Sequence, residues 1–385
     1  MKTIALCLEY PIHLKGGASV IVKTLLQGLR DSYRLILVSP DTEESVGSLL
    51  FDGAIMKHIY WNPAGVTLRQ SRKFADDLFS LGVDLAHFHC GGVFGWGNRR
   101  WWQSPIIYSA HRGIPCVFSS HLVVPILNGY RSSLRPKWLK MGLLPLAWSS
   151  KVITVLSEKA EILDSRQNYE MMKRWYWPVR SKFKYIYHSR LKNNSYCYVD
   201  KPREKVILCV GHIAMRKGQH ILAEAFAQIA DRYPEWSLVL AGPDIDSVCL
   251  LKVREIIDRY SIKNIKHLGE YEHPEDLMKK AAIYVQPSIH ESYGLALQEA
   301  LFYGCACIGS YVEGIPELIE DEVNGLLVKA EEIEELSNAL EGLIQKKDLR
   351  NRLSAQAHES IIKKKLSAEN MIKQHTELYE SILNK

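Results

Sequence analysis

Long hydrophobic runs and paired cysteines are missing from these 385 residues. No stretch approaches the roughly 18 consecutive apolar residues that a membrane-spanning helix needs. The apolar run at the amino terminus is short and Glu9 interrupts it, which argues against a secretory signal. The eight cysteines are scattered, without a Cys-x-x-Cys pair, so we expect small buried hydrophobic side chains in a reducing compartment. These absences predict a cytoplasmic protein.

Two recognition patterns are also absent. No Gly-x-Gly-x-x-Gly follows a predicted first strand, which makes a dinucleotide oxidoreductase the weakest interpretation. Lys and Arg are spread over many elements rather than gathered on one recognition helix, so we expect no nucleic-acid partner.

Charge of one sign dominates the first half of the chain. Residues 1–195 hold 26 Lys+Arg against 13 Asp+Glu, whereas residues 196–385 hold 23 against 30. A basic first half favours an anionic neighbour, such as a membrane surface or a phosphorylated substrate.

The length predicts two domains rather than one large core. Short apolar strands alternate with helix-length segments in both halves, which indicates two doubly wound α/β domains with parallel sheets. Residues 190–204 are polar and lack periodicity, which places the linker there. We therefore predict domains over 1–195 and 196–365, with a final helix over 366–385 that crosses back to the first domain.

The segment HESYGLALQEALFYG, residues 290–304, places two carboxylates around a glycine-containing turn. The turn follows the apolar strand AIYVQPS and leads into a helix, so it lies where open α/β sheets bind ligands. The first backbone N–H groups of that helix, at Gly294, Leu295 and Ala296, suit a diphosphate. Glu291 and Glu299 then suit sugar and ribose hydroxyls, although in isolation such a pair is more often a helix-end charge and a solvated face.

A second loop, in VGHIAMRKGQHILAEAF, supports the anion site. Arg216 and Lys217 follow a strand and precede a helix, where cations neutralise a diphosphate without a metal. Either residue alone is also consistent with an ordinary solvated loop.

These residues resemble the retaining glycosyltransferases of family 4, which have the two-domain GT-B fold with two Rossmann-like domains facing across a cleft. Four features carry the resemblance: the two glutamates with seven residues between them, Lys217 with Gly218, the EGIPE segment and the amino-terminal Gly16–Gly17 pair. It covers essentially the whole chain and is most specific from 205 to 330.

The resemblance implies roles residue by residue. Lys217 resembles the phosphate-binding lysine and Glu291 the donor-sugar contact. The remaining expected donor contacts are Gly16, Gly17, His212, Arg216, Gly294, Leu295, Ala296 and Glu299. PCVFSSH resembles the strand that ends in a histidine near the reacting centre, which is His121, although a lone histidine is more often structural.

Three positions depart from the family pattern. His212 follows Gly211 where the family usually has Gly-Arg, and Glu313 stands where a second glycine is common. YIYHSR replaces an Asn-Gly pair. These departures concern the phosphate contacts and the loops around them.

The resemblance also implies a reaction without a protein nucleophile, in which the leaving diphosphate takes the acceptor's proton. Asp244 and Asp246 are better interpreted as a turn and a helix cap than as metal ligands. We expect no cofactor and no metal requirement.

The acceptor is expected on the basic first domain. NRRWWQ, RSSLRPKWLK and KRWYWPVRSKFKY combine cations with aromatic side chains, which suits the surface of an anionic membrane as well as it suits an ordinary core and surface. We expect a nucleotide-sugar donor, a UDP- or GDP-sugar, and a saccharide or lipid-linked saccharide acceptor in surface polysaccharide or glycolipid assembly. The protein would then be peripheral on the inner face of the cell membrane.

Two alternatives remain open. A nucleotide-sugar epimerase uses a similar fold but needs acid/base residues that turn over the donor alone. The other is a non-catalytic nucleotide-sugar-binding protein: if the replacement of the family's arginine by His212 abolished transfer, binding would persist without turnover.

Overall fold

The computed structural model describes residues 1–13, 16–62, 66–90, 103–121, 152–155, 183–192, 196–291 and 293–384. The chain forms two compact units. Unit 1 comprises Met1–Lys192 with Ser367–Lys385, and unit 2 comprises Asn193–Leu366. No helix in the described ranges is long and apolar enough to span a membrane.

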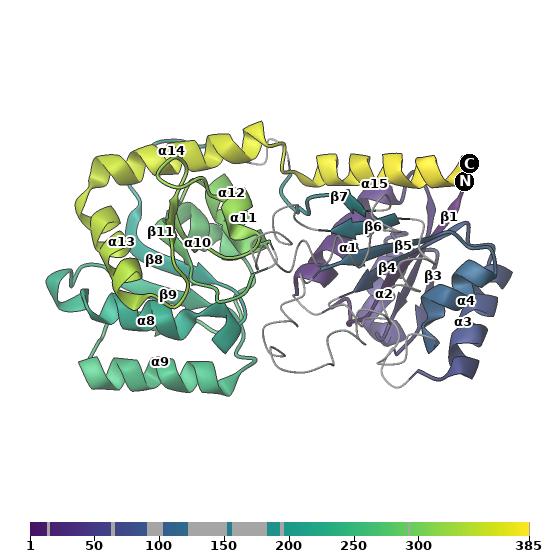
Figure 1. The fold of residues 1–385 in the computed structure, drawn as a ribbon, viewed down its shortest axis with the longest axis horizontal. Helices are drawn as coiled ribbons and strands as arrows, with labels where there is room; N and C mark the ends of the chain where they lie inside the picture. The colour runs from purple at the N-terminus through teal and green to yellow at the C-terminus, as the bar shows by residue number, and fades with distance from the viewer. Residues whose placement is uncertain are drawn as a thin grey trace, which may run out of the picture. The chain divides into compact units, whose positions relative to one another are not determined.

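Unit 1 is built on a parallel sheet with the strand order β3-β2-β1-β4-β5-β6-β7 (Figure 1). The strands are β1 (Thr3–Leu8), β2 (Arg34–Ser39), β3 (Lys57–Tyr60), β4 (Leu85–Cys90), β5 (Cys116–Ser120), β6 (Val152–Val155) and β7 (Phe183–Tyr185). The helices are α1 (Gly17–Leu29), α2 (Glu43–Phe51), α3 (Leu68–Ser80), α4 (Pro105–His111) and α15 (Ala368–Leu383). Every strand pair is parallel, as the alternation of strands and helices predicts.

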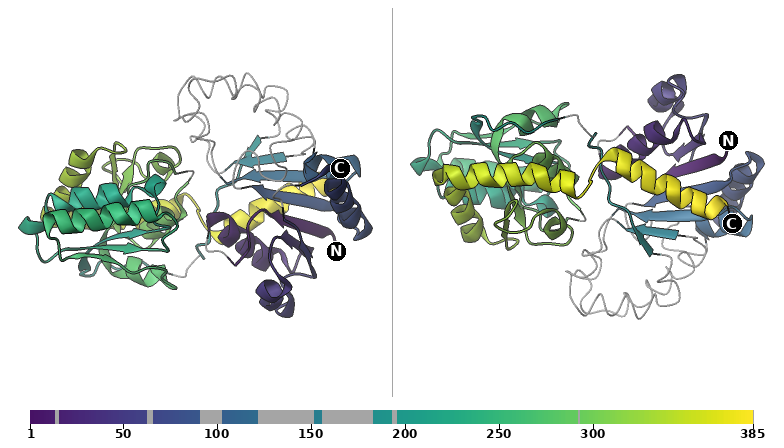
Figure 2. Two further views of the ribbon diagram at one scale, coloured as in Figure 1. Left: turned by 90° about the horizontal axis from the view of Figure 1, so that it is seen from below. Right: turned by 90° about the horizontal axis from the view of Figure 1, so that it is seen from above.

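The last helix of the chain, α15, returns to unit 1, where it lies along the sheet beside α1 (Figure 2). Gly28 of α1 lies at this contact, where a Cβ would lie 2.1 Å from the side chain of Ile372 and would force that side chain to move. The predicted crossing helix is therefore present.

Unit 2 repeats the architecture with the strand order β10-β9-β8-β11-β12-β13. Its strands are β8 (Glu204–Val210), β9 (Ser237–Ala241), β10 (Ile265–His267), β11 (Ala281–Gln286), β12 (Ala306–Ser310) and β13 (Leu326–Val328). Its helices are α8 (Gln219–Ala227), α9 (Ser247–Tyr260), α10 (Pro274–Lys280), α11 (Leu295–Phe302), α12 (Ile315–Leu318), α13 (Ile333–Gln345) and α14 (Lys347–Lys363). The expected pair of doubly wound α/β sheets is confirmed.

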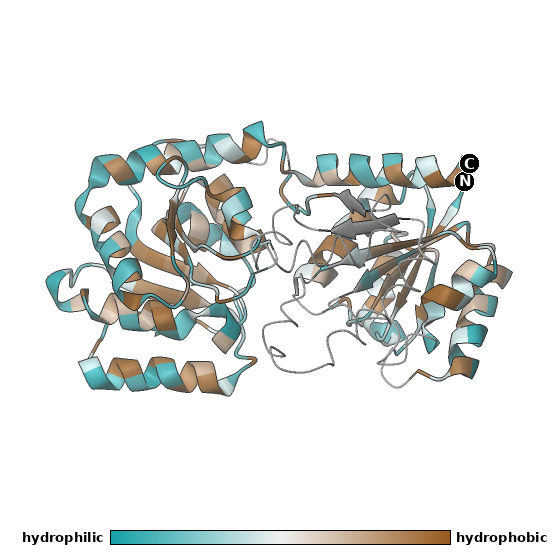
Figure 3. Cartoon of the chain, in the orientation of Figure 1, coloured by the Kyte–Doolittle hydropathy of each residue, from teal (hydrophilic) through white to brown (hydrophobic). Residues whose placement is uncertain are grey.

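The central strands are coloured mainly as hydrophobic and most helices alternate between hydrophobic and hydrophilic residues (Figure 3), and the buried apolar residues form the cores beneath these helices. In unit 2, α8 packs against α9 and α13, while α11 packs against α10 and α14. Strands that are buried on both faces have continuous hydrophobic sequences, so most of these strands can be predicted from the sequence.

Three local expectations are wrong. The apolar pattern of the sequence does not indicate β3, because two of its four residues are exposed and the other two are only partly buried. The amphipathic segment 218–233 predicts one continuous helix, but α8 ends at Ala227 and a separate 3₁₀ turn covers Ala230–Arg232. Among the described cysteine side chains, Cys197 is exposed whereas the others are buried.

Candidate functional site

The topology of unit 2 identifies the place on its sheet where a ligand fits. From β8 the chain winds outward through β9 and β10, and from β11 it winds the other way through β12 and β13. The strand order therefore reverses between β8 and β11, and open α/β sheets bind ligands outside the carboxyl ends of such strands. The loop after β8 carries Lys217, and the loop after β11 carries Glu291.

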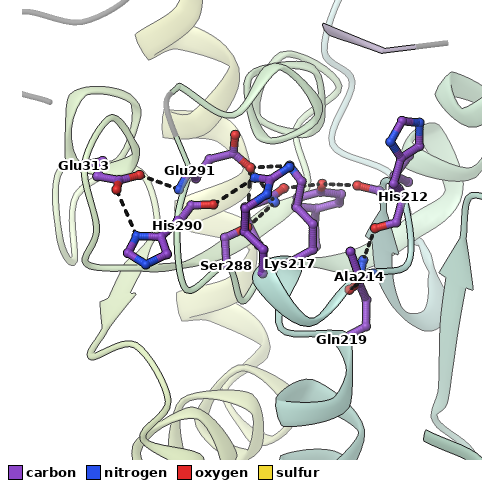
Figure 4. A network of polar contacts seen from close by, with 12 residues as sticks. His212, Ala214, Lys217, Gln219, Ser288, His290, Glu291 and Glu313 are labelled. Atoms are coloured by element: carbon purple, nitrogen blue, oxygen red, sulfur yellow. Dashed lines mark hydrogen bonds and ion pairs between the residues drawn. The ribbon is translucent and has the colours of Figure 1, made fainter. Parts of the chain in front are cut away.

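These two side chains form an ion pair (Figure 4). Lys217 Nζ lies 2.5 Å from Glu291 Oε2, and the side chains are 18% and 10% exposed. Gln286 Nε2 at 3.2 Å and the Ser288 hydroxyl at 3.4 Å donate to the same oxygen. Among the described residues, all these contacts reach Oε2, while the second carboxylate oxygen points away from them.

Electrostatics keep this carboxylate ionised. Burial alone would raise the pKa of Glu291, but Lys217, Arg216 and the Ser288 hydroxyl outweigh it and lower the pKa below its usual value. An ammonium group has three N–H donors, of which one serves Glu291. Lys217 therefore retains donors for an anion, and Glu291 retains an oxygen for hydroxyl groups.

Arg216 ties the two loops together. Its guanidinium donates from Nη1 to the His290 carbonyl at 3.0 Å, and its own carbonyl accepts the Ile289 N–H at 2.9 Å. The sequence assigns Arg216 to a phosphate. The structure places it beside the Lys217–Glu291 pair, where it lowers the pKa of Glu291.

Glu313 fixes the Glu291 loop from the other side (Figure 4). Its carboxylate accepts the Glu291 backbone N–H at 2.6 Å and lies 3.0 Å from His290 Nδ1. Its φ is +39°, in the region that favours glycine, which accounts for the glycine that the family resemblance leads us to expect here. The sequence indicates only that Glu313 departs from the family's glycine; it does not indicate that this side chain anchors the Glu291 loop.

Glycine at position 218 is required by the chain itself. Its φ is +72°, and a Cβ there would lie 1.9 Å from the Pro287 carbonyl oxygen. The loop after β8 therefore approaches the end of β11 at backbone distance, which brings Lys217 to Glu291. The Lys-Gly dipeptide in the sequence was the signal for this approach.

The first turn of α11 presents the other expected donor contacts. Gly294 is its amino-terminal cap with φ +91° and no capping side chain, and Leu295 and Ala296 begin the helix. The first amides of a helix have no intrahelical acceptor. Glu299, further along the same helix, is only 4% exposed, so it does not lie on a solvated face.

His212 contributes its backbone to the loop after β8. The buried Gln219 side chain donates to the His212 carbonyl at 2.9 Å and accepts the Ala214 N–H at 3.4 Å. Gln219 therefore holds the loop that carries Lys217, a role that the sequence did not reveal. Asp246 caps α9 and also accepts the Met215 N–H, so its interpretation as a helix cap is confirmed.

The remaining predicted residues lie in unit 1. Gly16 caps α1 in an extended conformation, and a Cβ there would meet no atom of the described chain within 4 Å. Gly17 is the first residue of α1. The described residues therefore give no steric reason for glycine at position 16.

His121 follows β5 and is buried. Its Nε2 lies 3.0 Å from His89 Nδ1, and burial lowers its pKa to about 3, so the ring is neutral. It belongs to a cluster of five buried histidines, which we call the histidine cluster: His87, His89, His121, His188 and His375. The sequence separation of these residues conceals the cluster, and only His121 was singled out.

The basic aromatic stretches lie largely outside the described residues. NRRWWQ, RSSLRPKWLK and KRWYWPVRSKFKY are described only at Gln103 and 183–185. Their assignment to a membrane surface stays a prediction.

Two family models match the chain. Residues 198–360 match the model described as glycosyl transferases group 1, and residues 15–179 match the model described as glycosyltransferase family 4. A curated relative, D-inositol 3-phosphate glycosyltransferase of Corynebacterium urealyticum, is 25% identical over 319 residues, 78% of this chain and 72% of that protein.

Solved structures share the fold. Anabaena Alr3699/HepE in complex with UDP has a TM-score of 0.75 at 18% identity, covering 99% of this chain and 100% of that one. WaaG, a glycosyltransferase involved in lipopolysaccharide biosynthesis, has a TM-score of 0.69 at 14% identity, covering 97% and 99%.

Proposed function

The chain belongs to the glycosyltransferase group 1 family, family 4, and on that premise we propose that it moves a sugar from a UDP-sugar to a saccharide hydroxyl with retention of configuration. The family supports the transferase activity, and the Alr3699/HepE complex supports UDP as the nucleotide. The observation that carries the proposal is the Lys217–Glu291 pair at the point where the strand order of unit 2 reverses.

The proposed donor occupies the loops after β8 and β11. Its diphosphate binds the remaining Lys217 donors and the first amides of α11, a helix whose start favours an anion. The oxygen of Glu291 that points away from Lys217 accepts hydrogen bonds from sugar hydroxyls. Glu299, one turn into α11, takes the ribose.

The proposed mechanism places the catalytic work on charge stabilisation. The bond between the anomeric carbon and the diphosphate oxygen breaks, and the diphosphate leaves with the electron pair. Lys217 and the α11 amides stabilise the charge that develops there, each well-placed donor contributing about 2.7 to 4 kcal/mol. The departing diphosphate accepts the proton of the acceptor hydroxyl, which attacks the same face of the sugar, so neither a protein nucleophile nor a metal is needed.

We further propose a lipid-linked saccharide as the acceptor, in polysaccharide or glycolipid assembly. The net charge of +13 over residues 1–195 supports attraction to an anionic surface, and the involvement of WaaG in lipopolysaccharide biosynthesis supports such a pathway. A cytoplasmic protein would then act on the inner face of the membrane. Co-sedimentation with anionic vesicles should weaken as salt is added; binding that does not respond to salt would contradict this.

Thermal stabilisation by nucleotides tests the donor site. UDP, GDP and ADP are added without metal to the native chain, to Glu299→Ala and to the control Glu235→Ala, whose side chain pairs with Lys205 outside the site. UDP at about 100 times its dissociation constant should stabilise the native chain and the control by roughly 2.7 kcal/mol, and Glu299→Ala by less. No stabilisation by any nucleotide would refute the proposed donor site.

A further inference from the structure

The sheet of unit 1 also reverses its strand order at one place. From β1 the chain winds outward through β2 and β3, and from β4 it continues the other way through β5, β6 and β7. The loop after β1, which contains His13 and ends near Gly16, therefore lies at the position on unit 1 that corresponds to the Lys217 loop of unit 2. The topological rule predicts a ligand there as well.

A buried carboxylate holds His13 in this loop. Asp41, which follows β2, lies with Oδ1 2.8 Å from His13 Nδ1. The Asp41 side chain is 0% exposed, whereas that of His13 is 54% exposed. The buried Asp41 carboxylate therefore holds an imidazole ring, that of His13, which remains accessible to solvent.

Asp41 makes two further hydrogen bonds. Its Oδ2 accepts the Ile12 N–H at 2.7 Å and the Ser39 hydroxyl at 2.6 Å. Ser39 in turn lies 3.1 Å from His58 Nε2 on β3, so three neighbouring segments converge on this carboxylate. Asp41 is therefore fixed in place by contacts with β2 and with the loop after β1.

The contact fixes the tautomer of His13. An ionised carboxylate has no proton to give, so Nδ1 must carry the proton and donate it. In the neutral ring Nε2 then bears a lone pair and accepts hydrogen bonds. With a neutral imidazole the pair carries a charge of −1, which favours a neutral hydroxyl ligand over a phosphate.

We propose that His13, oriented by Asp41, forms an acceptor-binding site on unit 1, in which His13 Nε2 accepts a hydrogen bond from a hydroxyl group of the saccharide acceptor. His13 touches the substrate, and Asp41 is a positioning residue. The inference rests on the proposed transferase function and adds a residue that neither the family resemblance nor the donor site assigns.

The tautomer is the first test, and it requires no substrate. In the full-length chain labelled with ¹⁵N-histidine, the signal that disappears in His13→Asn identifies His13. Its long-range ¹H–¹⁵N pattern should show a protonated Nδ1 and an unprotonated Nε2, and Asp41→Asn, which can donate to Nδ1, should invert the pattern. A proton on Nε2 of the native chain at neutral pH would overturn the proposal.

Acceptor use is the second test. UDP release from UDP-glucose is followed with octyl glycosides of glucose, galactose, mannose and N-acetylglucosamine as hydroxyl probes. Asn at position 13 keeps a donor for Asp41, and with it the contact that holds the loop, but lacks an acceptor at the position of Nε2. His13→Asn should raise the KM of the accepted glycoside roughly three- to tenfold, the value of one neutral hydrogen bond.

Controls separate this proposal from the donor site. His273→Asn removes another exposed histidine that lies 3.2 Å from a carboxylate, Glu275, but on unit 2, and should leave the glycoside KM unchanged. UDP stabilisation should be the same in all these variants. An unchanged glycoside KM in both His13→Asn and Asp41→Asn would overturn the acceptor site, whereas absent UDP stabilisation in the native chain would refute the proposed function instead.

Discussion

The histidine cluster predicts that unit 1 loses stability in mild acid. Burial lowers the pKa of all five histidines, to about 3 for His121 and about 4 for His375, so the folded state keeps them neutral. In the unfolded chain they titrate near the ordinary value of 6.5. The unfolded state therefore binds protons first as the pH falls. The stability that the cluster contributes is complete above 6.5 and is lost between 6.5 and the folded pKa values.

The size of the effect follows from proton linkage. Between pH 7.5 and 5.5, a histidine that stays neutral when folded and titrates at 6.5 when unfolded costs about 1.4 kcal/mol of stability. Five such histidines cost about 7 kcal/mol, which is comparable to the whole stability of a typical domain, about 5 to 15 kcal/mol. We therefore expect unit 1 to be several kcal/mol less stable at pH 5.5 than at pH 7.5.

Tryptophan fluorescence reports on this transition. Of the nine tryptophans, only Trp236 belongs to unit 2. Urea unfolding followed by fluorescence at pH 7.5, 6.5 and 5.5 therefore measures mainly unit 1. His375→Leu should reduce the loss of stability between pH 7.5 and 5.5 by about one fifth, because the unfolded variant takes up one proton fewer. The control His220→Leu, in unit 2, should leave the loss unchanged.

Two results would refute this reasoning. One is a loss of less than about 1.5 kcal/mol between pH 7.5 and 5.5, which is the contribution of a single histidine. The other is an identical loss in His375→Leu and the native chain, because the protons would then be taken up elsewhere.

Three substitutions in unit 2 test the donor loops. Glu313→Gly removes the acceptor of the Glu291 N–H but also relieves a left-handed conformation that costs about 1 kcal/mol, so thermal stability should change little while UDP-glucose affinity falls in a binding titration. Lys217→Ala leaves Glu291 buried without its cation and should destabilise unit 2 by about 3 kcal/mol in urea unfolding. Lys217→Arg, which keeps a cation, should lose less stability. Equal stability of the native chain and both variants would show that the ion pair contributes nothing to stability. Gly218→Ala should destabilise by more than about 1 kcal/mol, because its Cβ would collide with the Pro287 carbonyl; a stabilised variant would contradict the backbone geometry.

The fold of unit 2 was predictable because its central strands are buried over most of their length. Continuous apolar runs predict parallel strands when a turn and a helix follow them, as they do after β8 and β11. The strand β3 was not predictable in this way, since two of its four residues are exposed and the other two are only partly buried. The end of α8 at Ala227 was not predictable either, because the apolar period continues beyond it in the sequence.

The candidate site was predictable in position but not in detail. Lys217 and Glu291 both follow parallel strands, so their loops had to meet at one edge of the sheet. Their ion pair, by contrast, depends on the close approach of Gly218 to Pro287, and the Glu313 anchor depends on a left-handed backbone.

Long-range contacts were the least accessible to sequence analysis. His87 and His375 are far apart in sequence, and their rings meet only because α15 returns to unit 1. The same holds for His13 and Asp41, which two separate loops bring together. No local period or spacing encodes such pairs.

The central claim is that Lys217 binds the diphosphate of the donor and Glu291 binds its sugar, and calorimetric titration tests this directly. UDP and UDP-glucose are titrated into the native chain, Lys217→Ala and Glu291→Gln. Lys217→Ala should weaken both ligands, because both carry the diphosphate. Glu291→Gln should bind UDP about as well as the native chain does but lose the additional affinity that the sugar provides. If Glu291→Gln bound both ligands as the native chain does, or if Lys217→Ala left UDP affinity unchanged, the proposed donor site would be contradicted.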